Sequence, residues 1–549
     1  MHLVYSAVIW LLIFFLPLSF GAVQPWAQLI LVCCSCLLML LLPFKNRSLA
    51  ITKPAKPIYF IIAFLFLLAA AQSLNIKTIF TAPFWIPFTI SPLDTLDFAG
   101  YILTLGGFFI IASQTYQRHS SVKRLCFVIS ISGLLTALIG FSSGKGEYIN
   151  FFTGIGYVKE TFGPYLNRNH AAVFLNLCFF ASLAWVVPFI IKQQKEGFYI
   201  RKSELIIKCL PPVLLSVFIA GGVIFSRSRG GILALACGIF FYIALLLLFN
   251  FKHIRTKVIS LSLLAALFVG MGFLIVHNAE NINKFSRRDG ENWGYSVETR
   301  KNLYNAGYYM LMDYKTFGIG FNAFSAGIYT YLDKPINAYV EHLHNDWLEL
   351  AAGGGLLCVA ALLSGILWFM FAAYKRLRKL PKDKFLTFCA VLSAVFSMAL
   401  ASFFDFHLFI PSNAILFFIM LGLAASPTFS KDKLREIKIT PVFSIAFTLL
   451  FLPFVLLSFN KAHAWRLTSF AKVATGKNKI VLFEKALKKY PHPRNALRLA
   501  IAQYNISNDR DLPLEERKYF RLQARNLSAD YLQHYPLYKE ILNIHNKSI

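Results

Sequence analysis

The stretch "VIFSRSRGGILALACGIFFYIALLLLF", residues 223–249, places two arginines where one apolar run ends and the next begins. An apolar run of about 20 residues is long enough to cross a bilayer as an α-helix. A charged side chain inside hydrocarbon is costly, so Arg227 and Arg229 need a reason to stand at this junction. They either extend toward lipid headgroups or bind an anionic ligand. The stretch therefore predicts a membrane protein with a candidate anion site.

The rest of the chain repeats the apolar pattern of this stretch. Of its 549 residues, 57% are hydrophobic and 15% are charged, and the mean hydropathy is +0.57; a soluble domain has roughly 25% charged residues. We therefore predict an all-α polytopic membrane protein with about 13 transmembrane helices, which excludes a soluble enzyme. The expected centres lie near residues 12, 35, 67, 106, 133, 181, 217, 240, 267, 361, 395, 418 and 450. No clear small-residue cleavage site follows the first run, so we expect no cleaved signal peptide.

The connections between the apolar runs predict the orientation of the chain. Lysine and arginine gather in every second connection, and short basic loops stay in the cytoplasm. These connections are residues 45–57, 117–124, 192–208, 251–257, 375–384 and 430–438. We therefore expect a cytoplasmic N-terminus and, after an odd number of spans, a C-terminus outside. Much of the net charge of +29 belongs to these anchors beside membrane lipids, so it does not indicate nucleic-acid binding.

Two long polar regions fall on the outer side and define the domain organisation. We predict a transmembrane domain over residues 1–459, which includes an outer loop at 277–347, and a soluble helical domain over 460–549. The loop is too long for a simple connector. The tail carries 17 Lys and Arg against 7 Asp and Glu and has the pattern of about three to five amphipathic helices. It is either a solvated cap or a basic surface for an anionic glycan, a lipid or a protein partner.

The segment "EHLHND", residues 341–346, directly precedes the apolar run near residue 361. A histidine has a suitable pKa for a base or hydrogen-bond donor near neutral pH, which makes His342 and His344 candidates for such a role. A zinc site needs a third ligand that this segment does not clearly supply, so we expect no metal. The alternative is a capping cluster at a helix start, in which Asn345 and Asp346 would take part.

Further polar residues are expected on the same outer side. Arg168 and His170 occur in "NRNH" at the start of one span, and Arg300 lies at the start of the amphipathic segment "ETRKNLYNAGYYMLMDY". Asp405 and His407 lie between two spans. A buried acid there needs a partner, and an outer arginine is the natural one. Each of these residues could also be a cap or a solvated side chain. Their common side nevertheless makes them candidates for a substrate wall.

In combination, these motifs resemble the bacterial O-antigen ligase and polymerase superfamily, which also contains protein O-oligosaccharyltransferases. The resemblance covers about residues 100–425 and depends on five segments in order: "TFGPYLNRNH", "SRSRGG", the "R…GIG…F" loop, "HNDWLEL" and "DFHLFIPSNA". It implies an enzyme of the bacterial inner membrane that acts on the periplasmic side. The donor would be a glycan on a polyprenyl diphosphate, typically undecaprenyl. The acceptor would be lipid A–core, another glycan repeat or a protein hydroxyl, and no cofactor or metal would be required.

The resemblance also assigns roles to individual residues. Arg227, Arg229 and Arg300 would hold the donor diphosphate, and His344 would be the catalytic histidine. The weaker candidates for substrate contacts are His342, Arg168, Asn345, His170 and Asp405. One departure stands out, because relatives often carry a glutamate where this chain has Gly353, while Glu349 lies one turn earlier.

Two other classes of function remain open from the sequence. A flippase or polysaccharide exporter also has a dozen or more spans and cationic cavities. Such a protein more often carries charges deep in its spans and repeated halves, and no inverted repeat is evident here. An assembly factor without chemistry would use the outer loop only as a binding surface.

Overall fold

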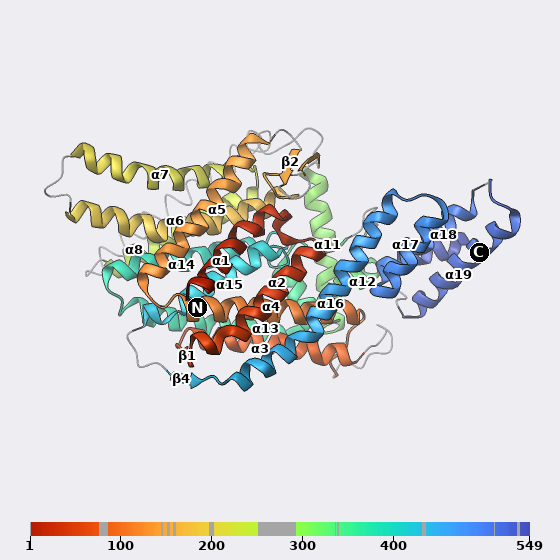
Figure 1. Ribbon diagram of the computed structural model, residues 1–549, viewed down its shortest axis with the longest axis horizontal. Helices are drawn as coiled ribbons and strands as arrows, with labels where there is room; N and C mark the ends of the chain where they lie inside the picture. Colours follow the sequence, from red (N-terminus) through yellow and green to blue (C-terminus); the bar gives the residue numbers. More distant parts are fainter. Residues whose placement is uncertain are drawn as a thin grey trace.

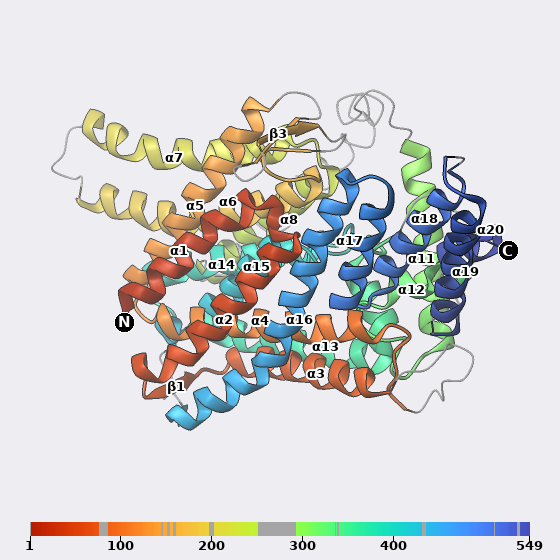
Figure 2. The same cartoon turned by 45° about the vertical axis from the view of Figure 1, so that its right-hand side comes forward.

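The computed structural model describes residues 2–75, 86–143, 147–150, 154–157, 161–196, 202–250, 293–334, 336, 340–430, 435–509, 511–534 and 539–548. These residues fold mainly as α-helices, with two short two-stranded sheets, short 3-10 helices, turns and loops besides. The all-α polytopic fold expected from the sequence is confirmed. Figures 1 and 2 show the transmembrane helices as one bundle, with the C-terminal helices beyond one end of it.

Ten described helices are long and apolar enough to cross a membrane. They are α2 (Pro25–Lys45), α3 (Ala55–Leu74), α4 (Pro92–Thr115), α5 (His119–Ser142), α6 (Arg168–Glu196), α7 (Lys202–Phe225), α8 (Arg229–Asn250), α13 (Asp346–Leu377), α14 (Lys382–Ala401) and α16 (Pro441–Val473). Two shorter apolar helices are α1 (His2–Leu18) and α15 (Pro411–Ala425). Twelve of the thirteen expected centres lie inside these helices, and the centre near residue 267 lies outside the described residues.

Short strands join connections that are far apart in the sequence. Strand β1 (Ser48–Ile51) pairs antiparallel with β4 (Arg435–Lys438), which brings together two of the basic connections, 45–57 and 430–438. Figure 1 shows this pair at the lower edge of the bundle, whereas the C-terminal helices lie on the right. The second sheet pairs β2 (Glu147–Asn150) with β3 (Gly154–Tyr157) in the connection between α5 and α6. Helices α6, α8, α13 and α15 all begin at one end of the bundle, which we call the site end.

Buried hydroxyl groups help to hold the helices of the bundle together. Ser132 Oγ donates to the carbonyl of Ile13 over 2.9 Å, and Ser397 Oγ donates to the carbonyl of Ala234 over 2.9 Å. Association of transmembrane helices depends on close packing and on such hydrogen bonds, because lipid tails are as apolar as the side chains. These contacts fix the relative positions of the helices that carry the site.

Helix α13 is interrupted at Gly355, which has φ +68° and ψ −172°. The loop after α11 (Trp293–Asp313), which leads to α12 (Phe324–Tyr331), fills the break. The N–H groups of Ile319 and Gly320 donate to the carbonyls of Ala352 and Gly353, each over 3.1 Å. Backbone groups freed inside a membrane protein must find partners within the protein. The paired loop therefore holds the first part of α13, and the residues just before it, in place.

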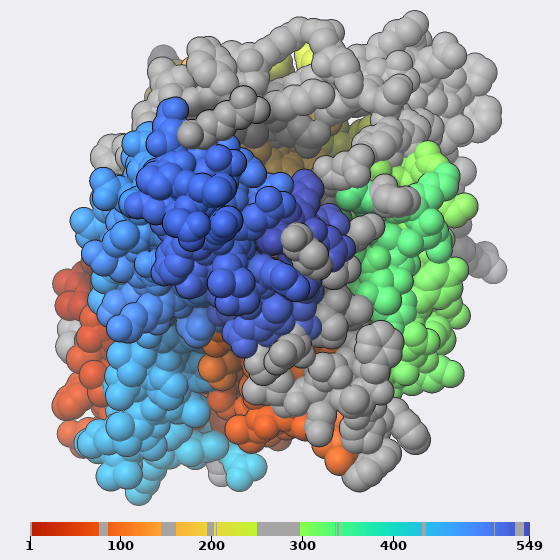
Figure 3. Space-filling model, turned by 90° about the vertical axis from the view of Figure 1, so that its right-hand side faces the viewer, coloured from red at the N-terminus to blue at the C-terminus, as the bar shows by residue number. Residues whose placement is uncertain are grey.

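The C-terminal residues form a small helical unit that continues directly from α16. Its helices are α17 (Gly476–Lys489), α18 (Pro493–Ser507), α19 (Leu514–His534) and α20 (Lys539–Ser548). Helix α16 runs through the expected domain boundary at 459/460 without a break. Figure 3, which looks onto this end, shows the C-terminal helices beside the green residues of α11 and α12. Arg494 of α18 contacts Glu341 with an N–O distance of 3.1 Å, so this unit reaches the segment that carries His344.

Candidate active site

Asp405 lies in the turn between α14 and α15 and contacts three distant segments of the chain. Its Oδ1 is 2.7 Å from Nδ1 of His344, and its Oδ2 accepts a hydrogen bond of 2.8 Å from Nδ2 of Asn169. The backbone N–H of Phe406 donates to Oδ1 over 3.0 Å, and a guanidinium nitrogen of Arg300 lies 3.6 Å from Oδ2. The side chain of Asp405 is only 3% exposed. One buried acid thus joins four segments, and the expected pairing with an arginine is present.

The partners of Asp405 determine its charge. Burial by itself would raise the pKa of the Asp405 carboxyl, but the charge and the hydrogen bond of His344 hold that pKa well below its usual range. An ionised carboxylate only accepts hydrogen bonds, so Nδ1 of His344 carries the donated proton. In the neutral imidazole the other nitrogen, Nε2, then has a lone pair for a substrate proton. The His344 side chain is 33% exposed, so a substrate can approach it.

The arginine junction connects to this acid through two hydrogen bonds. Ser228, between the two arginines, donates from its Oγ to Oδ1 of Asn169 over 2.8 Å, and Asn169 in turn donates to Asp405. Arg227 has φ +57°, which is uncommon for a residue other than glycine. Arg229 is the first residue of α8, and it is exposed. Both arginines therefore belong to a turn whose position is tied to the site.

His342 bonds to a different carboxylate. Its Nδ1 is 2.9 Å from Oε1 of Glu349, and the backbone N–H of Leu343 donates to Oε2 over 2.8 Å. Burial lowers the pKa of His342, but the charge and hydrogen bond of Glu349 outweigh this effect and the pKa is raised. The two histidines of the motif thus have separate acids. Within the described part of the chain, no three His, Cys, Asp or Glu residues are grouped so that they could hold a metal ion.

The ring of Phe406 lies among three histidines. Its centroid is 4.5 Å from that of His342, in a stacked arrangement, and 4.7 Å and 5.0 Å from those of His170 and His344, in edge-on arrangements. Nδ1 of His170 lies 3.2 Å from Nδ1 of His407. A bond between two ring nitrogens requires a lone pair on one of them, so these two imidazoles are not both charged. Burial lowers the pKa of His407 to about 4, which agrees with a neutral ring.

Arg168 and Asn345 stand at the starts of helices. Arg168 is the first residue of α6, next to Asn169, and it is 7% exposed. The side chain of Asn345 accepts the N–H of Leu348 over 3.1 Å and caps α13, which is the capping alternative considered for this segment. A substrate contact for either residue stays a prediction.

Close packing explains the departure from the family pattern at Gly353. A Cβ atom at this position would lie 3.1 Å from Cα of Phe321 and 3.2 Å from the carbonyl oxygen of Gly320, so a glutamate there would require the loop to shift. Glu349, one turn earlier, is 3% exposed and bonds to His342. It is therefore the acid that this chain places beside the histidine segment.

Sequence reasoning did not predict the contacts of three residues that connect the site. Ser228 and Asn169 were visible only as polar neighbours of Arg229 and Arg168, and Phe406 was visible only between an acid and a histidine in "DFH". Their contacts join positions 236 residues apart in the case of Asn169 and Asp405. The signal that was available is that each stands beside, or between, residues already singled out.

The arrangement combines features that group-transfer chemistry requires. A carboxylate orients an imidazole, a guanidinium lies beside the same carboxylate, and the imidazole is open to solvent. Such a set can accept a proton from a hydroxyl group and stabilise an anionic leaving group next to it.

Residues 214–363 match the family model described as O-antigen ligase. The match runs from within α7 into α13 and contains the arginine junction, α11 and the "HNDWLEL" block; residues 168–170 and 405 lie outside it. It confirms the resemblance in this part of the chain. No curated protein sequence matches the chain. The chain is thus a multi-pass membrane protein with an O-antigen ligase segment, and this segment supports a function of the ligase or polymerase type.

Proposed function

We propose that this membrane protein with an O-antigen ligase segment transfers a glycan from a polyprenyl diphosphate to an acceptor hydroxyl group. The observation that carries the proposal is the shared contact at Asp405. One carboxylate oxygen lies 2.7 Å from Nδ1 of His344, and the other lies 3.6 Å from the guanidinium of Arg300. A base and a phosphate-binding cation are thereby held next to one another, as this reaction needs.

The donor diphosphate binds on the arginine side of the site. The side chain of Arg300 is 35% exposed, and its planar fork of N–H groups suits phosphate oxygens. Arg227 and Arg229 belong to the turn that Ser228 ties to Asn169. As the bond to the sugar breaks, negative charge develops on the diphosphate, and fixed cations stabilise that charge.

His344 acts as the general base. The acceptor oxygen attacks the anomeric carbon and forms the new glycosidic bond, while the bond from that carbon to the diphosphate oxygen breaks. The electron pair stays with the polyprenyl diphosphate, and the hydroxyl proton passes to Nε2 of His344. Asp405 orients the ring and stabilises the imidazolium. Direct attack inverts the anomeric configuration.

We place the site end on the periplasmic face of the bacterial inner membrane. The support is the positive-inside rule, because the basic connections 45–57 and 430–438 meet at the opposite end. The N-terminus is then cytoplasmic and the C-terminus periplasmic.

A reconstituted system tests the proposal. Purified protein in proteoliposomes receives a purified polyprenyl-diphosphate glycan together with acceptor, and the covalent product is measured. We expect transfer by the wild type and by His463→Gln, a matched change on α16. We expect at least a hundredfold loss in His344→Gln. Movement of intact donor without product would support a flippase instead, and full activity of a folded His344→Gln would refute the role of this residue.

A further inference from the structure

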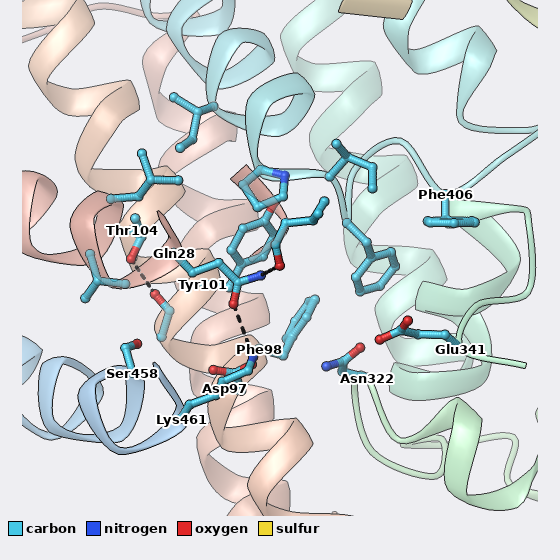
Figure 4. Close-up of a pocket in the computed structure, with 18 of the residues that line it drawn as sticks. Gln28, Asp97, Phe98, Tyr101, Thr104, Asn322, Glu341, Phe406, Ser458 and Lys461 are labelled. Carbon is cyan, nitrogen blue, oxygen red and sulfur yellow. Dashed lines mark hydrogen bonds and ion pairs between the residues drawn. The ribbon is translucent and has the colours of Figure 1, made fainter. Parts of the chain in front are cut away.

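A cavity of about 510 Å³ has Phe406 in its wall. Its lining includes Phe406 and His342, but neither His344 nor Asp405. Residues of α2, α4 and α16 form one side, and residues near 322, 341 and 406 form the other (Figure 4). The volume falls in the range of about 300–1,000 Å³ that is usual for small-molecule sites. The proposed function gives this cavity no role.

The charges in the cavity wall are already balanced. Lys461 forms an ion pair with Asp97 and donates a hydrogen bond of 3.2 Å to Oε1 of Gln28 (Figure 4). Glu341, on the opposite side, pairs with Arg494 of the C-terminal unit. Among the described residues that line the cavity there is no arginine. An anionic phosphate group therefore finds no surplus positive charge here, in contrast to the arginine side of the site.

Aromatic rings supply much of the remaining wall. Tyr101, Phe406 and Phe409 are half-buried and line the cavity, and Phe98 lies between the two sides in Figure 4. A sugar ring presents C–H groups on its faces and hydroxyl groups around its edge. Aromatic faces contact the C–H groups through dispersion and weak C–H interactions, and carboxylate and amide groups form hydrogen bonds with the hydroxyl groups. Flat rings with Asp97, Gln28 and Asn322 around them provide both kinds of contact.

We propose that this cavity binds uncharged sugar residues of a glycan acceptor. The inference rests on the proposed function and deepens it, because it selects a glycan over a protein hydroxyl as the acceptor. The donor diphosphate occupies the arginine side, and sugar residues of the acceptor occupy the cavity, whose wall includes Phe406. Since the ring centroids of Phe406 and His344 are 5.0 Å apart, a sugar that contacts Phe406 lies near the base.

Binding of a free glycan to purified full-length protein tests the proposal. The probe is the glycan released from the donor by mild acid and labelled at its reducing end. In Ser458→Phe, an added ring occupies the cavity, because Ser458 lines it and is 7% exposed. The matched control is Leu456→Phe on the same helix, where the side chain is 54% exposed. A third variant, Arg300→Met, alters the arginine side only.

We expect Ser458→Phe to raise the Kd of the free glycan at least tenfold and to leave binding of inorganic diphosphate unchanged, which also shows that the variant is folded. Leu456→Phe should bind both ligands like the wild type, and Arg300→Met should lose diphosphate but keep the glycan. No glycan binding by the wild type, or equal binding by Ser458→Phe, would overturn the inference. A rise in the Kd of the intact donor alone in Ser458→Phe would indicate that the polyprenyl tail occupies the cavity and would also overturn it. Failure of the proposed function is distinguishable, because it appears as an absence of covalent transfer by the wild type.

Discussion

Replacement of Asp405 by asparagine changes the charge of the central acid while its shape is kept. Three N–H donors and a guanidinium converge on its two oxygens: Nδ1 of His344 and the N–H of Phe406 on Oδ1, and Nδ2 of Asn169 with Arg300 on Oδ2. An asparagine has one oxygen and one NH₂ group, so one side of the contact must place donor against donor. If the NH₂ group faces His344, then Nδ1 becomes the acceptor and Nε2 carries the proton. The base is lost in that arrangement.

The size of the effect follows from the step that is lost. A positioned general base contributes about 10²–10⁴ in rate. The expected fall in kcat for Asp405→Asn is therefore on the order of a hundredfold or more, or about 2.7 kcal/mol of transition-state stabilisation at its lower limit. The KM for the donor should change much less, because the arginines remain.

Initial rates of glycan transfer in proteoliposomes, at saturating donor and acceptor, give kcat for the variant. The matched control is Asp383→Asn, because this acid lies at the start of α14 and its side chain is 63% exposed. We expect the control to transfer glycan like the wild type. A folded Asp405→Asn protein with kcat within about threefold of the wild type would show that Asp405 does not support a general base, since general-base losses begin near a hundredfold.

The remaining predictions concern stability and are read as apparent Tm in detergent. Gly355→Ala places a Cβ atom 2.3 Å from a backbone oxygen at φ +68°, so Tm should fall clearly. The control Gly221→Ala has its nearest contact at 3.6 Å and should keep a Tm near that of the wild type. Equal Tm values for the two variants would contradict the described break in α13. Lys461→Met leaves the charge of Asp97 without its partner, so it should lower Tm more than the double variant Lys461→Met/Asp97→Asn does. If the double variant were less stable than Lys461→Met, the ion pair would not explain the result. The pKa of His407 is about 4 in the folded protein and near 6.5 in the unfolded chain, so its contribution to stability is complete above about pH 6.5 and is lost as the pH falls toward 4. His407→Asn, which cannot take up this proton, should lose less Tm between pH 6.5 and 4.5 than the wild type, and an identical loss would refute this assignment.

The transmembrane helices are predictable from the sequence because each depends on a local property. An apolar run of sufficient length predicts a span wherever it occurs, and twelve of the expected centres lie inside described helices. The break at Gly355 was not predictable, since it depends on a loop from elsewhere that donates to the freed carbonyls. A run of three glycines permits close approach or an unusual backbone conformation but identifies neither.

The site was predictable in its charges but not in its connections. An acid between two spans requires a cation, and this reasoning correctly anticipated an arginine near Asp405. Which arginine it is, and the path from Ser228 through Asn169, depend on helix packing that no local pattern contains. The sequence showed only that Glu349 lies one turn before the position where relatives carry an acid. Its hydrogen bond to His342 depends on packing around Gly353 that the sequence does not contain.

The decisive test of donor binding beside His344 is a structure of the His344→Gln variant with intact polyprenyl-diphosphate glycan bound. In this complex the diphosphate should contact Arg300 together with Arg227 or Arg229, and the anomeric carbon should face residue 344. A diphosphate bound away from these arginines, or an anomeric carbon on the far side of the Phe406 ring from residue 344, would contradict it.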